Sequence, residues 1–127
     1  MARTGSASGK IIIAETGEAV DFSVNFSPSF TNVAEHVTGK IVIPAGNTVL
    51  IGLGGVSVLS FIWFRATDVV TKNPKAVLYT IIASATGTGA HATELLMVAS
   101  ENGDADELEV IAQSGNDTLV EYALAGV

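Results

Sequence analysis

Alternation of apolar and polar residues is the clearest pattern in the chain. Between residues 18 and 27 the apolar positions are Val20, Phe22, Val24 and Phe26, and the polar positions between them are Asp21, Ser23, Asn25 and Ser27. Successive side chains of a β-strand point to opposite faces, so this period of two predicts a strand with one face turned inward. Pro28 follows directly and predicts the end of the strand, because proline cannot donate to a β-ladder.

Other short apolar runs predict further strands. We expect them over residues 10–14, 39–43, 48–52, 56–66, 76–83, 108–113 and 118–124, whereas residues 30–38 fit either a loop or a strand. The segment Ile43–Gly46 predicts a type I turn, because proline suits its second position and glycine its fourth. Gly54-Gly55, Asn102-Gly103 and Ser114–Asp117 predict further turns, and the segments 67–75 and 84–92 predict loops.

The segment from Thr93 to Ser100 allows two interpretations. Its glutamate, leucine, methionine and alanine residues favour a helix, and Asp104 and Glu107 have capping-box spacing before the next apolar run. The neighbouring elements, however, are short strands at intervals of about 8–12 residues, as in sandwiches and barrels. We therefore expect strands on both sides of the Asn102-Gly103 turn within residues 93–113, with helix as the alternative for each. The complete pattern predicts an all-β protein, an antiparallel two-sheet β-sandwich of jelly-roll type with about eight strands.

The length of 127 residues suits one domain. Residues 1–9 are small and polar and include Gly5 and Gly9, a composition typical of a flexible terminal segment. We expect an N-terminal arm over residues 1–9 and a single β-sandwich domain over residues 10–127.

The predicted strand from Val56 to Ala66 is unusual because both of its faces are apolar. One face carries Val56, Val58, Ser60, Ile62 and Phe64, and the other carries Ser57, Leu59, Phe61, Trp63 and Arg65. An antiparallel sheet in a small domain normally leaves one face in water, so the second face needs a cover. Without one, the second face would expose roughly 400–500 Å² of apolar surface, as much as the largest patch on a typical monomer.

Loops such as residues 67–75 are one candidate cover, and neighbouring subunits are the other. We favour neighbouring subunits, and therefore expect a protein that forms a homo-oligomer. The predicted subunit contacts are Ile11, Ile12, Ile13, Leu59, Phe61 and Trp63.

Composition and charge argue against several classes of binding partner. The net charge is −7, and the chain from Ala92 onward carries eight acidic residues with no lysine or arginine. A nucleic-acid-binding protein needs a basic stripe, so we expect no nucleic-acid partner. No run of about 20 apolar residues could span a bilayer and the N-terminus lacks an apolar signal segment, so we expect no membrane association. The absence of cysteine excludes disulfides and thiolate metal sites.

Motifs for catalysis are weak. The run Gly52–Ser57 has serine where a dinucleotide-binding loop requires its third glycine, and no helix is predicted after it. Ala7 stands where a serine hydrolase elbow needs its nucleophile. His36 and His91 are the candidate bases of the chain, and both fall in predicted loops without a surrounding motif. We expect no enzyme and no cofactor.

The acidic loop at residues 102–107 is the best candidate for a cation, because oxygen ligands at alternate positions can wrap calcium. Glu107 and Gln113, however, occupy the positions where an EF-hand needs glycine and glutamate, so a solvated loop is the default interpretation. Trp63, with Phe61 beside it, could stack on a sugar. Stacking on nucleic-acid bases would need a basic groove, which the charge distribution does not favour.

Three segments give the chain a resemblance to a known class of proteins: Ile41–Ile51, Ser60–Arg65 and Asn116–Gly126. Together they resemble small β-sandwich virion proteins of tailed phages, of the head decoration or cement type, over most of residues 10–127. The resemblance implies a non-enzymatic subunit, often trimeric, that contacts the major capsid protein or other virion proteins and strengthens the shell. It also implies location in the virion after assembly in the host cytoplasm. The alternative is a carbohydrate- or receptor-binding module of a tail or fibre.

Overall fold

All regular structure in the described residues is β-strand. The computed structural model of the protein describes residues 3–14, 20–33, 35–52, 56, 59–83, 91–99 and 105–127. Within these ranges, no helix has the length and the apolar character that crossing a bilayer would require.

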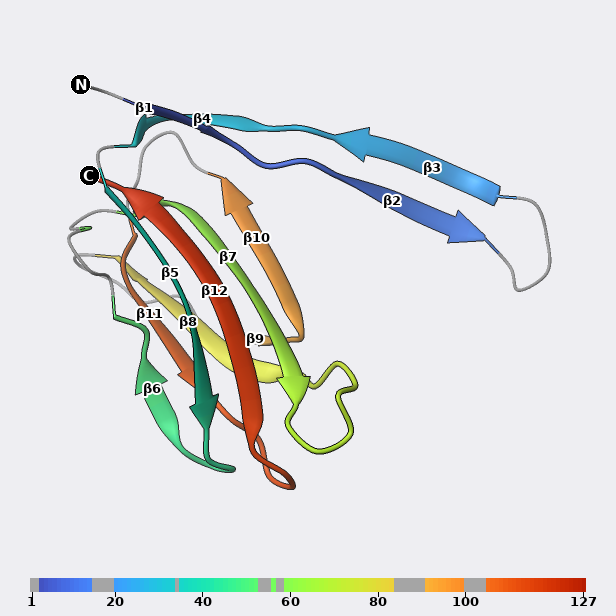
Figure 1. Ribbon diagram of the computed structural model, residues 1–127, viewed down its shortest axis with the longest axis vertical. Coiled ribbons are helices and arrows are strands. Elements are labelled where there is room, and N and C mark those ends of the chain that lie inside the picture. The colour runs from blue at the N-terminus through green and yellow to red at the C-terminus, as the bar shows by residue number, and fades with distance from the viewer. Residues whose placement is uncertain are drawn as a thin grey trace.

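The first four strands form one narrow ribbon, which we call the arm. They are β1 (Arg3–Ser6), β2 (Gly9–Ala14), β3 (Val20–Phe26) and β4 (Ser29–Val33). Strand β1 pairs antiparallel with β4, and β2 pairs antiparallel with β3. Between the two ladders the Ala7 amide donates to the Pro28 carbonyl oxygen over 3.0 Å, so the ribbon continues past the proline. Figure 1 shows the β2–β3 end of the arm extending away from the rest of the molecule.

The other eight strands form two four-stranded antiparallel sheets. They are β5 (Glu35–Ile43), β6 (Thr48–Leu50), β7 (Leu59–Asp68), β8 (Val77–Ala83), β9 (His91–Thr93), β10 (Leu95–Ala99), β11 (Ala105–Ile111) and β12 (Thr118–Gly126). Sheet I has the order β5-β12-β7-β10, sheet II has the order β6-β11-β8-β9, and the pair Ala105–Leu59 joins them at one side. This is the strand order of an eight-stranded jelly roll, so the predicted fold class is confirmed.

The main core fills the space between the two sheets. Phe64 of β7 and Leu108 of β11 are completely buried there. The Phe64 ring meets the Tyr79 ring of β8 edge-on, with 5.6 Å between the ring centroids. Because the two sheets face each other, alternate residues of each strand reach this core and the residues between them point outward.

The base of the arm covers one end of the outer face of sheet I. Val33 of β4, Phe61 of β7 and Ala125 of β12 form a second small core, with Ala7 and Trp63 packed against it. Phe61 is 8% exposed, and Leu59, which belongs to the main core, is 2% exposed. The expectation that a single chain leaves Leu59 and Phe61 uncovered is therefore wrong. Leu59 is covered by the main core, and Phe61 is covered by the chain's own N-terminal segment rather than by the loop at residues 67–75.

Several local predictions can be compared with the strands. Residues 95–99 and 105–111 are strands, which confirms strand over helix, and most of the ambiguous segment 30–38 belongs to β4 and β5. The turn after β5 lies one residue later than predicted. The Asn47 amide donates to the Pro44 carbonyl, and Gly46 has φ 79° at the third turn position, which makes this a type II turn. The predicted turns at 54–55 and 102–103 lie outside the described residues.

The predicted domain boundary at residue 9 stays a prediction. Strand pairing groups β1 to β4 together, so the ribbon outside the two sheets extends to Val33. His91 and Ala92, expected in a loop, belong to the short strand β9, and the rest of that loop lies outside the described residues.

Candidate functional site

Two rows of side chains cross the outer face of sheet I. Phe64 points into the core, so its neighbours Trp63 and Arg65 point outward. The strand register places Trp63 of β7 opposite Ala123 of β12, and Ala123 opposite Thr38 of β5. The same register gives a second row of Arg65, Glu121 and Lys40 on these three strands.

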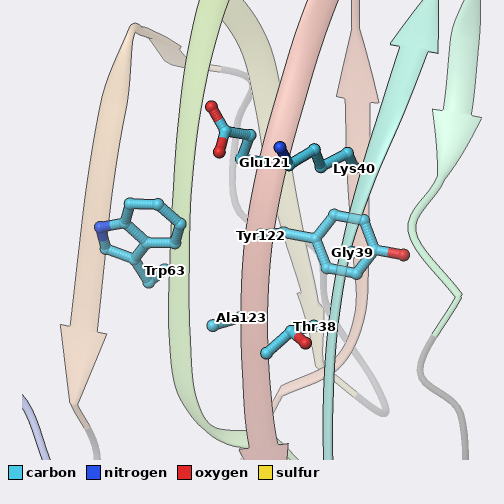
Figure 2. A pocket seen from close by; sticks show the side chains of 7 residues that line it. All are labelled: Thr38, Gly39, Lys40, Trp63, Glu121, Tyr122 and Ala123. Carbon is cyan, nitrogen blue, oxygen red and sulfur yellow. The ribbon is translucent and has the colours of Figure 1, made fainter.

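A hollow of about 300 Å³ lies where these two rows meet, and we call it the polar hollow. Its lining residues are Thr38, Gly39, Lys40, Trp63, Glu121, Tyr122 and Ala123. Figure 2 shows Trp63 on one side, Thr38 and Lys40 on β5 on the other, and Ala123 on the strand between them. The hollow exists because the small Ala123 stands between the larger Trp63 and Thr38 in one cross-strand row.

The second row is a chain of charges. Arg65 Nη2 lies 2.8 Å from Glu121 Oε1, and the two form a hydrogen-bonded ion pair. The hydrogen bond from Arg65 holds the pKa of Glu121 below its ordinary value, partial desolvation opposes this, and the positive charges of Arg65 and Lys40 add to the lowering. Glu121 is therefore ionised at neutral pH, and the row Lys40–Glu121–Arg65 has a net charge of +1.

A second hollow, of about 350 Å³, lies between the arm and the edge strand β10, and we call it the apolar hollow. Its lining residues are Ile11 and Phe26 from the arm, Leu95 and Met97 from β10, and Trp63. Leu95 is 57% exposed although it is a large apolar residue, and Met97 is the register partner of Trp63. Trp63 thus belongs to both hollows.

The predicted contact residues fall into three environments. Ile11, Ile12 and Ile13 lie on β2 of the arm and are 48%, 55% and 59% exposed. Leu59 and Phe61 are buried within the chain, whereas Trp63 is partly exposed. No partner chain is present, so the role of these residues in subunit contacts stays a prediction.

Sequence reasoning did not find Leu95 and Met97. Both point to the outer face of sheet I, as the alternation of β10 places them, and both line the apolar hollow. The alternation itself was the available signal, but the segment is short and its composition also suits a helix. Lys40 and Glu121 were missed as well, because only the register of three distant strands makes them neighbours.

The structure does not bring the candidate catalytic residues together. His36 is exposed on β5 of sheet I, and His91 is exposed on β9 of sheet II, where its ring lies 5.8 Å from the Tyr79 ring. Residues 102–104 of the acidic loop lie outside the described residues, and Glu107 is exposed on β11. In the part of the chain that the structure describes, no group of three or more histidine, aspartate or glutamate residues could hold a metal ion.

Comparisons of the chain with known protein families, with curated proteins and with solved structures find no match. Jelly rolls occur in viral capsid proteins, in lectins and in cupins, so the fold alone does not select a function. The function is therefore inferred from this protein's own residues, above all from the arm and the outer face of sheet I.

Proposed function

We propose that the protein is a non-enzymatic structural subunit of a viral particle, of the head decoration or cement type, which oligomerises through its arm and stabilises the shell. The observation that carries the proposal is the exposure of Ile11, Ile12 and Ile13 on an arm that projects from the sandwich (Figure 1). Large apolar side chains on a projecting segment are typical of a surface that another protein covers.

The arm has too few strands to be stable by itself. Strands β2 and β3 pair only with each other in the described residues, and an isolated two-stranded ribbon in water is marginally stable at best. One of its faces is largely apolar, because Ile11 is the register partner of the 40% exposed Val24, and Ile13 lies two residues further along the same face. Packing this face against a neighbour would remove apolar surface from water and stabilise the ribbon.

Charge favours a second copy of the chain as that neighbour. Residues 1–14 carry two basic residues, Arg3 and Lys10, and no acidic residue, whereas the eight acids from Ala92 onward all belong to the sandwich half of the chain. The first half of the arm, residues 3–14, is therefore basic and complements an acidic sandwich on the next subunit, although Glu15, Glu18 and Asp21 give the whole arm a net charge of −1. Identical contacts that close into a ring, such as the trimer that the resemblance implies, give every arm the same environment.

The viral context is supported by two features that agree. The jelly roll is a common fold of capsid proteins, and the segments Ile41–Ile51 and Asn116–Gly126 resemble decoration proteins of tailed phages. The major capsid protein or another virion protein is the proposed partner on the shell. An antibody against the protein should label intact particles purified from lysates of infected cells. Unlabelled particles from cells that express the protein would contradict a location in the virion.

Light scattering after size-exclusion chromatography tests the arm. The wild-type protein should elute as an oligomer, and Ile11→Ser/Ile13→Ser should be a monomer whose sandwich remains folded, as shown by a cooperative unfolding transition. The matched control is Leu50→Ser/Val70→Ser, which changes two residues that are at least as exposed, 55% and 69%, but lie on the sandwich. This control should remain an oligomer. A wild-type monomer at about 100 µM, or an oligomer that survives the arm substitutions, contradicts the arm as the subunit contact.

A further inference from the structure

The polar hollow has the dimensions and the chemistry of a small-ligand subsite. Its width spans two strand spacings, from Trp63 to Thr38, which is about 10 Å, and its length spans two residues, which is about 7 Å. These dimensions suit a single six-membered ring with substituents. Small-ligand sites characteristically combine an apolar or aromatic wall with a few polar groups that fix the orientation of the ligand.

The two cross-strand rows of side chains supply both the aromatic wall and the polar groups. Trp63 offers an indole ring that is partly exposed beside the hollow, and a Trp side chain combines a large apolar face with one N–H donor. Lys40 and Thr38 offer donors on the opposite wall, and Glu121 offers acceptors. The ion pair with Arg65 uses one carboxylate oxygen of Glu121 and fixes the side chain, so the orientation of its acceptors is set before a ligand binds.

We propose that the polar hollow binds one pyranose unit of a glycan, stacked on Trp63 and hydrogen-bonded to Lys40 and Glu121. A pyranose ring has C–H groups on its faces and hydroxyl groups around its rim, and therefore matches a hollow that combines an aromatic side chain with a charged row. A nucleic-acid base also stacks on tryptophan, but its phosphates would be repelled by a protein of net charge −7. A purely apolar ligand would offer no hydrogen bond to Lys40 or to the second carboxylate oxygen of Glu121.

This inference is independent of the proposed function. The arm and its isoleucines do not line the polar hollow, so glycan binding and oligomerisation are measured with different variants. If both hold, the subunit would also present a glycan-binding site on the outer face of sheet I. Lys40→Met separates the two properties, whereas Trp63 lines both hollows, so the oligomeric state of Trp63→Ala is also measured.

The protein contains its own reporter for the test, because Trp63 is its single tryptophan. The full chain is titrated with a panel of neutral and acidic mono- and oligosaccharides, to roughly 50 mM, which exceeds the millimolar Kd expected for a shallow site. At least one sugar should shift the Trp63 emission saturably. Lys40→Met should weaken that binding at least about tenfold, and Lys72→Met, the matched loss of a lysine in the β7–β8 loop, should leave it unchanged.

Calorimetry extends the test to Trp63→Ala, which lacks the reporter. This variant should lose binding at least about tenfold while its circular dichroism stays that of the wild type. No shift in Trp63 emission across the panel overturns the inference. Binding that persists undiminished in both Lys40→Met and Trp63→Ala also overturns it, as does an equal loss in Lys40→Met and Lys72→Met.

Discussion

The arm and the sandwich are both antiparallel β-structure, but the sandwich buries its large apolar side chains and the arm leaves them exposed. In the sandwich, Phe64 and Leu108 are completely buried because each sheet supplies the surface that covers the other. In the arm, Ile12 and Ile13 remain more than half exposed because a single two-stranded layer has no facing layer. The difference teaches that the hydrogen-bond ladder does not by itself bury apolar residues. A second layer does, and in the described residues the β2–β3 ribbon has none; under the proposed function, a neighbouring subunit supplies it.

Replacement of one large apolar residue in each region should give the largest contrast in the free energy of unfolding. Phe64→Ala should lower the free energy of unfolding by about 3–5 kcal/mol, because it leaves a cavity between two packed sheets. Ile12→Ala should change it by less than about 0.5 kcal/mol, because the side chain is already in water. Urea unfolding measures both changes in the free energy of unfolding. Each substitution is made in the Ile11→Ser/Ile13→Ser variant, so that subunit contacts do not contribute. Equal losses at the two positions would contradict the contrast between the regions.

Substitution of one glycine in each region should give a smaller difference in stability loss between the sandwich and the arm. Gly39 faces the Tyr122 ring and Gly9 faces the Phe26 ring, each as cross-strand register partners. A Cβ atom on Gly39 would lie 2.6 Å from the Tyr122 hydroxyl oxygen, and a Cβ atom on Gly9 would overlap the Phe26 ring.

Tyr122 is packed against the main core and cannot move freely, whereas Phe26 lies on a ribbon that is open to solvent. We expect Gly39→Ala to cost about 1–3 kcal/mol, and Gly9→Ala less than about 1 kcal/mol. Urea unfolding in the same background measures both changes. A larger loss for Gly9→Ala would show that the arm is packed as tightly as the sandwich.

The smallest expected effect on stability comes from substitution of Asp68, at the loop that follows β7. The Asp68 Oδ1 atom accepts hydrogen bonds from the Val70 amide over 2.8 Å and the Thr71 amide over 3.0 Å. The hydrogen bond from Thr71 is the main cause that holds the pKa of Asp68 below its ordinary value. Partial desolvation raises this pKa and opposes the effect. The hydrogen bonds from the Val70 amide and the Asn116 side chain and the charge of Lys75 lower it further.

Because the folded pKa of Asp68 is depressed, its contribution to stability is present above the unfolded pKa of about 3.9 and is lost as pH falls through the folded value. Asp68→Asn should therefore lower Tm at pH 7, and the difference from the wild type should shrink as pH falls below about 4. Thermal unfolding between about pH 2 and pH 7 measures this. A difference that is constant over the whole range would mean that the charge of Asp68 does not contribute.

Much of the fold was predictable because β-structure leaves a local signal. The alternation from Val20 to Phe26 identified β3, but the inward orientation predicted for its apolar face was wrong at Val24, which is 40% exposed. The short strands separated by turn residues identified an antiparallel sandwich. The apolar character of both faces around Phe61 correctly indicated that the outer face of this strand is covered at Phe61, although Trp63 and Arg65 further along it are not fully covered. These conclusions depend only on neighbours in the sequence, where the period of side-chain direction is fixed by backbone geometry.

The sequence did not determine what supplies that cover, or which polar residues meet. Val33 reaches Phe61 and Ala125 through the path of the arm, and Lys40 meets Glu121 and Arg65 through the order β5-β12-β7. These partners are far apart in the sequence, so no local pattern links them. Strand order and register are selected by the packing of both sheets at once, and a register change of one residue would move Trp63 from the outer face to the core. The chain alone therefore determined which segments are strands, and the tertiary structure decided which side chains share a surface, because burial acts on the assembled layers.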